Sequence, residues 1–350
     1  MRVLALVALL LLGGASAPGR AAAEGFQRGF VLTGQQRDTF LETSSDAALQ
    51  RMAAGGSDHV AIFTQWYLAT PRASVLAPDP ARTASDAAVL HASAVARQLG
   101  MEVTIKPQIA FRSGGWIGNA RPADLNLFWG RYRAMMLHYA DLAQRARASL
   151  LVIGTEMRTL SWDQARWRAL IAEIRARYHG ALTYGANYDE FLHVPFWDAL
   201  DYIGIDAYFP LADNANPAPS TAELAAAWSG RGYLTAIGGL SQRTGKKVLF
   251  TELGYRAIRS AAVHPSAWDV VDATDTQAQA RAYQAFYDAV AQQPWMAGVY
   301  WWEVDPGKWW VQDYEPINKP AENVLALANL RLTLAPLLPF LRAAGALMIQ

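Results

Sequence analysis

The chain has 350 residues, of which 52% are hydrophobic, so it is long enough to bury a large core. Its 31 Lys and Arg residues balance 30 Asp and Glu residues, and this nearly neutral charge argues against nucleic acid or another polyanion as a partner. No cysteine is present, which excludes disulfides, thiolate metal sites and a cysteine nucleophile.

Residues 1–23 have the chemistry of a secretory signal peptide. Arg2 gives the positive n-region, residues 3–12 form an apolar h-region, and three alanines precede Glu24, where we expect cleavage. The apolar run is well short of the roughly 20 residues that a membrane span needs, although an uncleaved anchor is the alternative. The pattern predicts a secreted or periplasmic protein with a bacterial type of signal and no stable membrane association after cleavage.

After the signal, short apolar runs alternate with longer helical stretches about eight times, which is typical of a parallel α/β fold. Strands are expected at residues 30–33, 59–67, 102–109, 150–153, 182–187, 202–208, 248–250 and 298–304. Helices are expected at residues 84–99, 125–148, 163–178, 223–228 and 276–292. Eight strands in one register favour a closed (β/α)₈ TIM barrel over an open sheet.

No linker or repeat divides residues 24–330, so they are expected to form one catalytic domain. Residues 331–350 form an apolar C-terminal tail, which Pro336, Pro339 and Arg342 interrupt within the length of a membrane span. We expect this tail to pack against the barrel or to fray. A monomer is favoured.

Two glutamates follow short apolar runs in the same way. Glu156 comes after LLVI and the pair GT, and Glu252 comes after VLF and a threonine. In a barrel of roughly 250 residues their separation is about three βα units, which places them on the fourth and seventh strands, facing each other across the mouth. Two such carboxylates suit glycoside hydrolysis, in which one protonates the leaving oxygen and the other attacks or activates water. The alternative is that each forms an ion pair, but no Arg or Lys is adjacent to either on its strand.

Other side chains at the strand ends are expected to bind substrate. They are Trp66, Lys106, Asn187, Asp206, Tyr208, Trp301, Trp302 and Glu303. Trp301 and Trp302 are successive on one strand, so at most one of them lines the mouth. Lys106 either holds sugar hydroxyls or pairs with an acid. The loop FRSGGWIGNARPAD has two adjacent glycines and Trp116, which indicates a lid or binding loop, with a plain surface connection as the alternative.

The sequence offers no sign of a metal or cofactor site. The six histidines show neither HxH nor HExxH spacing, no GxGxxG follows a strand, and no GK[ST] occurs. We therefore expect no catalytic metal and no cofactor.

Four motifs occur in order along the chain: IGTE at 153–156, LDYIGIDAYFPL at 200–211, LFTELGY at 249–255, and WWEVDP at 301–306 followed by DYEPINKPAENVL. With these motifs, residues 29–325 resemble glycoside hydrolase family 113, within the clan A barrels. The resemblance implies a retaining β-mannanase without a cofactor. It also implies that Glu156 is the general acid/base and Glu252 the nucleophile. Tyr208 is similar to the clan tyrosine that hydrogen-bonds the nucleophile and keeps it ionised.

One position departs from the clan pattern, because Thr155 stands where most clan A enzymes have asparagine. The usual hydrogen bond to the sugar 2-hydroxyl would then need another donor, and Asn187 is one candidate. We expect the surroundings of Glu156 to raise its pKa, and Tyr208 and nearby donors to lower that of Glu252.

The expected activity is hydrolysis of β-mannosidic linkages in mannan or manno-oligosaccharides, with a polysaccharide or oligosaccharide as the substrate. Two alternatives stay open. One is another retaining β-glycosidase of the same clan, such as a β-glucanase or β-mannosidase, and the other is a catalytically inactive carbohydrate-binding barrel.

Overall fold

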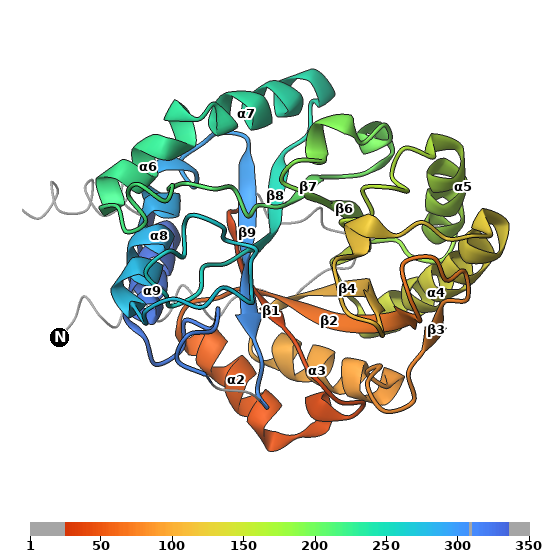
Figure 1. The fold of residues 1–350 in the computed structure, drawn as a ribbon. Helices are drawn as coiled ribbons and strands as arrows, with labels where there is room; N and C mark the ends of the chain where they lie inside the picture. Colours follow the sequence, from red (N-terminus) through yellow and green to blue (C-terminus); the bar gives the residue numbers. More distant parts are fainter. Residues whose placement is uncertain (1–24, 308–309, 336–350) are drawn as a thin grey trace, which may run out of the picture.

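The computed structural model describes residues 25–307 and 310–335, and Figure 1 shows their fold. The expected signal peptide and residues 336–350 of the expected tail lie outside the described residues. No helix in the described part of the chain is long and apolar enough to cross a membrane.

Eight parallel strands close into a barrel because β1 pairs with both β9 and β2. The barrel strands are β1 (Gln27–Leu32), β2 (His59–Leu68), β4 (Glu102–Phe111), β5 (Leu150–Thr155), β6 (Ala181–Asn187), β7 (Ile203–Asp206), β8 (Val248–Leu253) and β9 (Met296–Val304). A further short strand, β3 (Ala77–Pro78), pairs antiparallel with the end of β2. The predicted (β/α)₈ barrel is confirmed.

Helices surround the strands on the outside of the barrel (Figure 1). In the described ranges they are α2 (Thr43–Ala54), α3 (Asp86–Gln98), α4 (Leu125–Ala146), α5 (Gln164–Arg175), α6 (Thr221–Gly230), α7 (Tyr233–Thr244), α8 (Thr276–Ala289) and α9 (Pro320–Leu334). Single 3₁₀ turns lie at Thr39–Leu41, Ile117–Asn119, Phe191–His193 and Trp197–Ala199.

Three of these helices were not expected from the sequence, namely α2, α7 and α9. Helix α2 begins TSSD and buries only Ser45, Leu49 and Met52, so its apolar stripe is narrow. Helix α7 carries two adjacent glycines, which lower helix propensity. Helix α9 runs to Leu334, so the expected boundary at residue 330 between domain and tail falls inside it.

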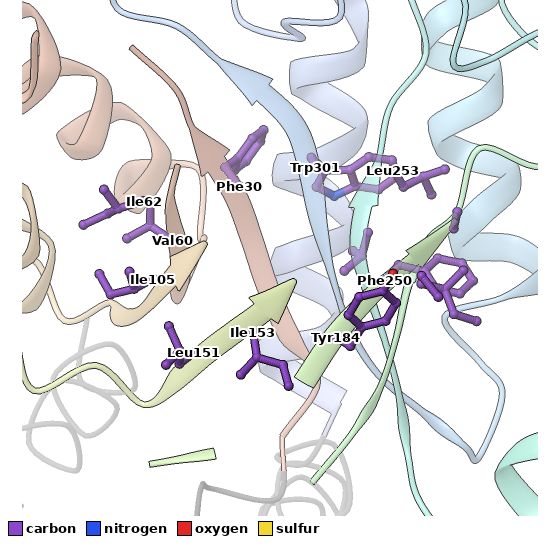
Figure 2. Packing of buried hydrophobic residues seen from close by; sticks show 14 of the residues in the cluster. Phe30, Val60, Ile62, Ile105, Leu151, Ile153, Tyr184, Phe250, Leu253 and Trp301 are labelled. Carbon is purple, nitrogen blue, oxygen red and sulfur yellow. The ribbon is translucent and has the colours of Figure 1, made fainter. Parts of the chain in front are cut away.

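The barrel strands bury both faces, and successive side chains alternate between two cores. On β2, Val60 and Ile62 belong to the large core between strands and helices, whereas Ala61 and Phe63 belong to a smaller cluster inside the barrel. Figure 2 shows residues of the large core from several strands. This alternation decides which side chains of a strand can reach the mouth from within.

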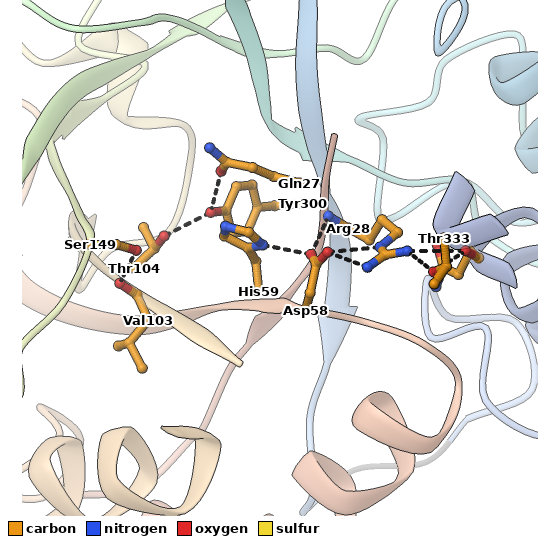
Figure 3. A network of polar contacts seen from close by, with 10 residues as sticks. Gln27, Arg28, Asp58, His59, Val103, Thr104, Ser149, Tyr300 and Thr333 are labelled. Atoms are coloured by element: carbon orange, nitrogen blue, oxygen red, sulfur yellow. Dashed lines mark hydrogen bonds and ion pairs between the residues drawn. The ribbon is translucent and has the colours of Figure 1, made fainter. Parts of the chain in front are cut away.

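A polar network lies near the N-terminal ends of the strands, opposite the mouth (Figure 3). The Tyr300 hydroxyl donates to Oε1 of Gln27 at 2.9 Å, and the Arg28 guanidinium lies 2.5 Å from Oδ2 of Asp58. Arg28 also donates to the backbone carbonyl of Asn329, which ties α9 to the start of β1. In barrel enzymes the chemistry takes place at the other end, so this network has a structural role.

Candidate active site

Glu156 directly follows β5 and has an unusual backbone conformation. Its φ is 51°, in the left-handed region that residues with side chains seldom adopt, at a cost of about 1–2 kcal/mol. Neighbouring groups hold it there: the N–H of Glu156 donates to the carbonyl of Gly185 at 2.7 Å, and the N–H of Met157 donates to the Tyr184 hydroxyl at 2.7 Å. That hydroxyl in turn donates to the buried carboxylate of Glu190 at 2.8 Å. The backbone of Glu156 is therefore fixed by β6.

Irregular pairing lies next to both glutamates. The register of β5 with β6 shifts between Val152 and Thr155, and that of β8 with β9 shifts between Phe250 and Leu253. Such shifts re-aim the side chains at the end of a strand and are common beside active sites.

Glu252 is buried and receives two contacts. The Tyr208 hydroxyl donates to its Oε2 at 2.9 Å, which is the contact that the resemblance implies. The Nζ of Lys106, whose side chain is completely buried, lies 3.1 Å from its Oε1. Of the two roles considered for Lys106, the structure therefore shows the ion pair. Inspection of the residues next to Glu252 on its own strand could not reveal this ion pair, because Lys106 lies on β4.

Lys106 also lies close to a second carboxylate, that of Asp206. Its Nζ lies 3.7 Å from Oδ1 of Asp206 and donates to the Thr155 hydroxyl at 3.2 Å. Thr251 donates to the same Oδ1 of Asp206 at 2.6 Å. Asp206 is completely buried in this arrangement, so it belongs to the charge network around Lys106 and is not exposed to a sugar.

Burial sets the protonation of the two glutamates. It raises the pKa of Glu156 well above the usual range, and the negative charges of Asp206 and Glu252 add to this effect. Burial and the charge of Asp206 also raise the pKa of Glu252 to about 7, although Lys106 and Tyr208 act in the opposite direction. The expectation that donors leave Glu252 with a lowered pKa is therefore wrong, because burial outweighs them.

Lys106 keeps its positive charge beside these carboxylates. Burial lowers the pKa of Lys106, but the charges of Asp206 and Glu252 outweigh burial and raise it above its ordinary value. Glu156 thus holds a proton next to a carboxylate that has a cation beside it. Two carboxyl groups with different environments can take the roles of acid and nucleophile.

Two expected substrate-binding tryptophans lie outside the barrel. Trp66 faces helix α4, with its ring 6.4 Å from that of His138, and Trp301 stacks on Tyr283 of α8 at 4.1 Å. Trp301 belongs to the core between strands and helices and the partly buried Trp66 packs against that core, so the structure places both in packing positions and corrects the expectation. Trp302 lies on the inner side, edge-on to Phe63 at 5.4 Å. One member of the Trp301–Trp302 pair therefore faces inward, as alternation requires.

The remaining candidates lie at strand ends. Asn187 ends β6 and is buried, and its side-chain oxygen accepts from the N–H of Tyr188 at 2.8 Å. Glu303 is partly buried and follows Trp302 across a cis peptide bond. The described residues contain no group of three or more His, Cys, Asp or Glu side chains that could hold a metal ion.

Sequence reasoning singled out the loop that carries Trp116 but not its contact. The indole Nε1 of Trp116 donates to Oε2 of Glu156 at 2.5 Å. The guanidinium of Arg158 lies 4.9 Å above the indole ring and is held by Asp189 at 2.7 Å. Only the Gly-Gly-Trp pattern in a long loop pointed to this residue.

The sequence model of Glycoside Hydrolase Family 113 matches residues 29–324. Two solved GH113 β-mannanase structures are similar over nearly their whole length. AaManA from Alicyclobacillus acidocaldarius, in complex with ManMIm, is 28% identical with a TM-score of 0.80, covering 88% of this chain and 98% of its own. A GH113 β-1,4-mannanase is 25% identical with a TM-score of 0.80, covering 87% and 99%.

A GH5_18 protein from Streptomyces cattleya, in complex with Manb1-4GlcNAc, shares the fold at 16% identity and a TM-score of 0.55, covering 87% of this chain and 80% of its own. The comparison with curated protein sequences returns no match. Because the family model spans well over half of the chain, this protein belongs to glycoside hydrolase family 113.

Proposed function

We propose that this glycoside hydrolase of mannanase type cleaves β-mannosidic linkages of mannan or manno-oligosaccharides with retention of anomeric configuration. The observation that carries the proposal is the difference between its two strand-end glutamates. Glu156 is partly buried and has a raised pKa, while Glu252 has the Lys106 ammonium 3.1 Å from one oxygen and the Tyr208 hydroxyl 2.9 Å from the other. The choice of mannan follows the β-mannanases to which the chain is similar.

The reaction then has two steps. In the first, the Glu252 carboxylate attacks the anomeric carbon while the bond to the leaving oxygen breaks, and Glu156 gives its proton to that oxygen. In the second, Glu156 takes a proton from a water molecule, the water oxygen attacks the anomeric carbon, and the bond to Glu252 breaks. Lys106 and Tyr208 stabilise the negative charge of Glu252 before attack and again when it leaves.

The first test measures reducing ends released from β-mannan, glucomannan, xylan and β-glucan. We expect turnover of the mannans, with loss of activity in Glu156→Gln and Glu252→Ala. Glu173→Gln is a matched control, because Glu173 is an exposed carboxylate on α5 that pairs with Arg133. Turnover of β-glucan in preference to mannan would move the assignment to another β-glycosidase. Binding of mannan without turnover of any substrate would indicate a carbohydrate-binding barrel.

The second test follows the anomeric proton of the first product by NMR. Retention requires the β-anomer to form first and then to mutarotate. Initial formation of the α-anomer would show inversion and would remove Glu252 from the role of nucleophile, since a single displacement needs no covalent intermediate.

We also propose that the protein is exported and acts as a monomer on its polysaccharide. The positive start, apolar run and alanine cluster of residues 1–23 support export. N-terminal sequencing of the exported protein should begin at Glu24, and retention of residues 1–23 in a membrane fraction would contradict cleavage. Light scattering of the mature protein should give the mass of one chain.

A further inference from the structure

We propose that Trp116 is a positioning residue for Glu156: its indole N–H occupies Oε2, directs the transferable proton to Oε1, and stabilises the carboxylate left when that proton has gone. This inference rests on the proposed function of Glu156 as acid/base. It goes beyond that function because it gives the two carboxyl oxygens of Glu156 different roles and identifies Trp116 as the cause of the difference.

The hydrogen bond itself supports this assignment. Nε1 of Trp116 lies 2.5 Å from Oε2 of Glu156. An indole nitrogen can only donate, so Oε2 must accept, and a carboxyl oxygen that carries the proton is the weaker acceptor. The proton of the neutral acid is therefore placed on Oε1, which is left to face the glycosidic oxygen. When Glu156 is ionised the same contact becomes charge-assisted and stronger.

The loop between β4 and α4 is shaped to bring the indole to this position. Gly114 and Gly115 have φ values of 75° and 101°, which residues with a side chain seldom adopt. A Cβ at Gly118 would lie 2.3 Å from the Trp116 ring, so glycine is needed there for the ring to pack against the backbone. The Thr159 hydroxyl donates to the carbonyl of Ala120 and ties this loop to the segment after Glu156.

A second contact, with Arg158, also holds the ring. The guanidinium of Arg158 lies over the Trp116 ring at 4.9 Å and pairs with Asp189 at 2.7 Å. A cation over an aromatic face is attractive, and an indole is the best such face among side chains. Trp116 is therefore fixed by Gly118 and Arg158 as well as by the carboxylate that it contacts.

Three other indole N–H groups in the described ranges contact groups that do not change charge, unlike the partner of Trp116. Those of Trp162, Trp167 and Trp197 donate to backbone carbonyls within their own segments. A backbone carbonyl stays neutral throughout the reaction, whereas the carboxylate of Glu156 changes charge. A donor to that carboxylate changes its proton affinity as well as its position.

Several titratable groups surround Glu156 and act together with Trp116. They are Lys106 on β4, Asp206 on β7, Glu252 on β8, and Tyr188 and Tyr208 after β6 and β7. Burial and the two negative charges raise the pKa of Glu156, while the Trp116 hydrogen bond and Lys106 lower it. Removing the indole N–H takes away one of the two opposing contributions, so the acid should hold its proton to higher pH.

The direct test is a carboxyl titration by NMR of protein labelled with [¹³C]glutamate, with the Glu156 signal assigned through Glu156→Gln. In Trp116→Phe we expect the midpoint of Glu156 to rise by about one pH unit, which is a tenfold change in its proton equilibrium. Trp162→Phe is the matched control, because Trp162 is an exposed indole in the adjacent loop that donates to a carbonyl. An unchanged midpoint in Trp116→Phe would overturn the proposal.

The kinetic test uses a dinitrophenyl β-mannoside, whose leaving group needs no proton. Its first step should then be nearly unaffected, whereas the second step needs ionised Glu156 to activate water. We expect kcat and KM to fall together in Trp116→Phe, about tenfold near neutral pH, and added azide to restore kcat because azide needs no base. A fall in kcat/KM that azide does not relieve would contradict the role of Trp116 in holding the ionised acid.

A second variant guards against misfolding of Trp116→Phe. Gly118→Ala keeps the indole but places a Cβ where the ring lies, so it should displace Trp116 and shift the titration in the same direction. The titration needs no turnover, so it separates the two proposals. Inactivity of the wild-type protein on every mannan would refute the proposed function, while the Glu156 midpoint in the two variants would still decide whether Trp116 sets its protonation.

Discussion

Replacing Lys106 with methionine removes the buried cation beside the nucleophile while keeping a chain of similar length. In the structure Nζ of Lys106 lies 3.1 Å from Glu252 and 3.7 Å from Asp206, and these side chains are nearly or completely inaccessible to water. Removing one partner of a buried ion pair leaves an uncompensated charge, at a cost of about 3–5 kcal/mol. Part of that cost is relieved if a carboxylate takes up a proton.

Glu252 is the group placed to do so, since its pKa is already about 7. Without the cation its pKa should rise further; at pH 7 the first unit of rise lowers the ionised fraction about fivefold, and each further unit lowers it about tenfold. We therefore expect kcat/KM of Lys106→Met at pH 7 to fall about fivefold for one unit of rise and about 50-fold for two, and the acidic limb of its pH profile to move to higher pH. The assay is kcat/KM against pH on manno-oligosaccharide, with exposed Lys247→Met as the matched control.

Unfolding measurements on Lys106→Met test whether the variant raises the pKa of Glu252. A carboxylate whose folded-state pKa lies above its unfolded value of about 4.5 binds protons more tightly in the folded protein, so stability rises as pH falls. The free energy of unfolding of Lys106→Met should therefore fall furthest below the wild-type value above pH 7, and the deficit should shrink toward pH 5. An equal loss of activity at every pH, with an unmoved acidic limb, would refute the reasoning that Lys106 acts through the charge of Glu252.

Three further predictions concern contacts around the site. Tyr208→Phe removes the 2.9 Å hydrogen bond to the nucleophile, a contact to a charged group worth about 1.5–3 kcal/mol, so steady-state kcat/KM should fall roughly 10- to 150-fold. Tyr184→Phe removes the partner of the backbone N–H after Glu156 and should lower the free energy of unfolding in urea by about 1–3 kcal/mol. Trp301→Ala should destabilise the fold by about 3–5 kcal/mol with little change in KM, and a large rise in its KM at wild-type stability would contradict its packing role.

The sequence by itself determined the barrel and the location of its two glutamates. Apolar runs of strand length recur between helical stretches, and only a closed set of parallel strands buries them all on both faces. Glu156 and Glu252 each follow such a run after a polar break, so both had to lie where strands end. These are local properties of the chain, readable without knowing which strands are neighbours.

Only the tertiary structure decided which side chains meet the glutamates. Lys106 and Glu252 come from strands far apart in sequence, and Trp116 reaches Glu156 through the shape of a glycine-rich loop. Trp66 was expected at the mouth and its strand was predicted correctly, but the alternation of side chains along β2 directs its ring toward helix α4. Successive side chains on a strand point to opposite faces, and irregular pairing interrupts this alternation. The residue types at the end of a strand therefore do not show which side chains face into the barrel. Closure of the barrel fixes the register, and the register fixes the site.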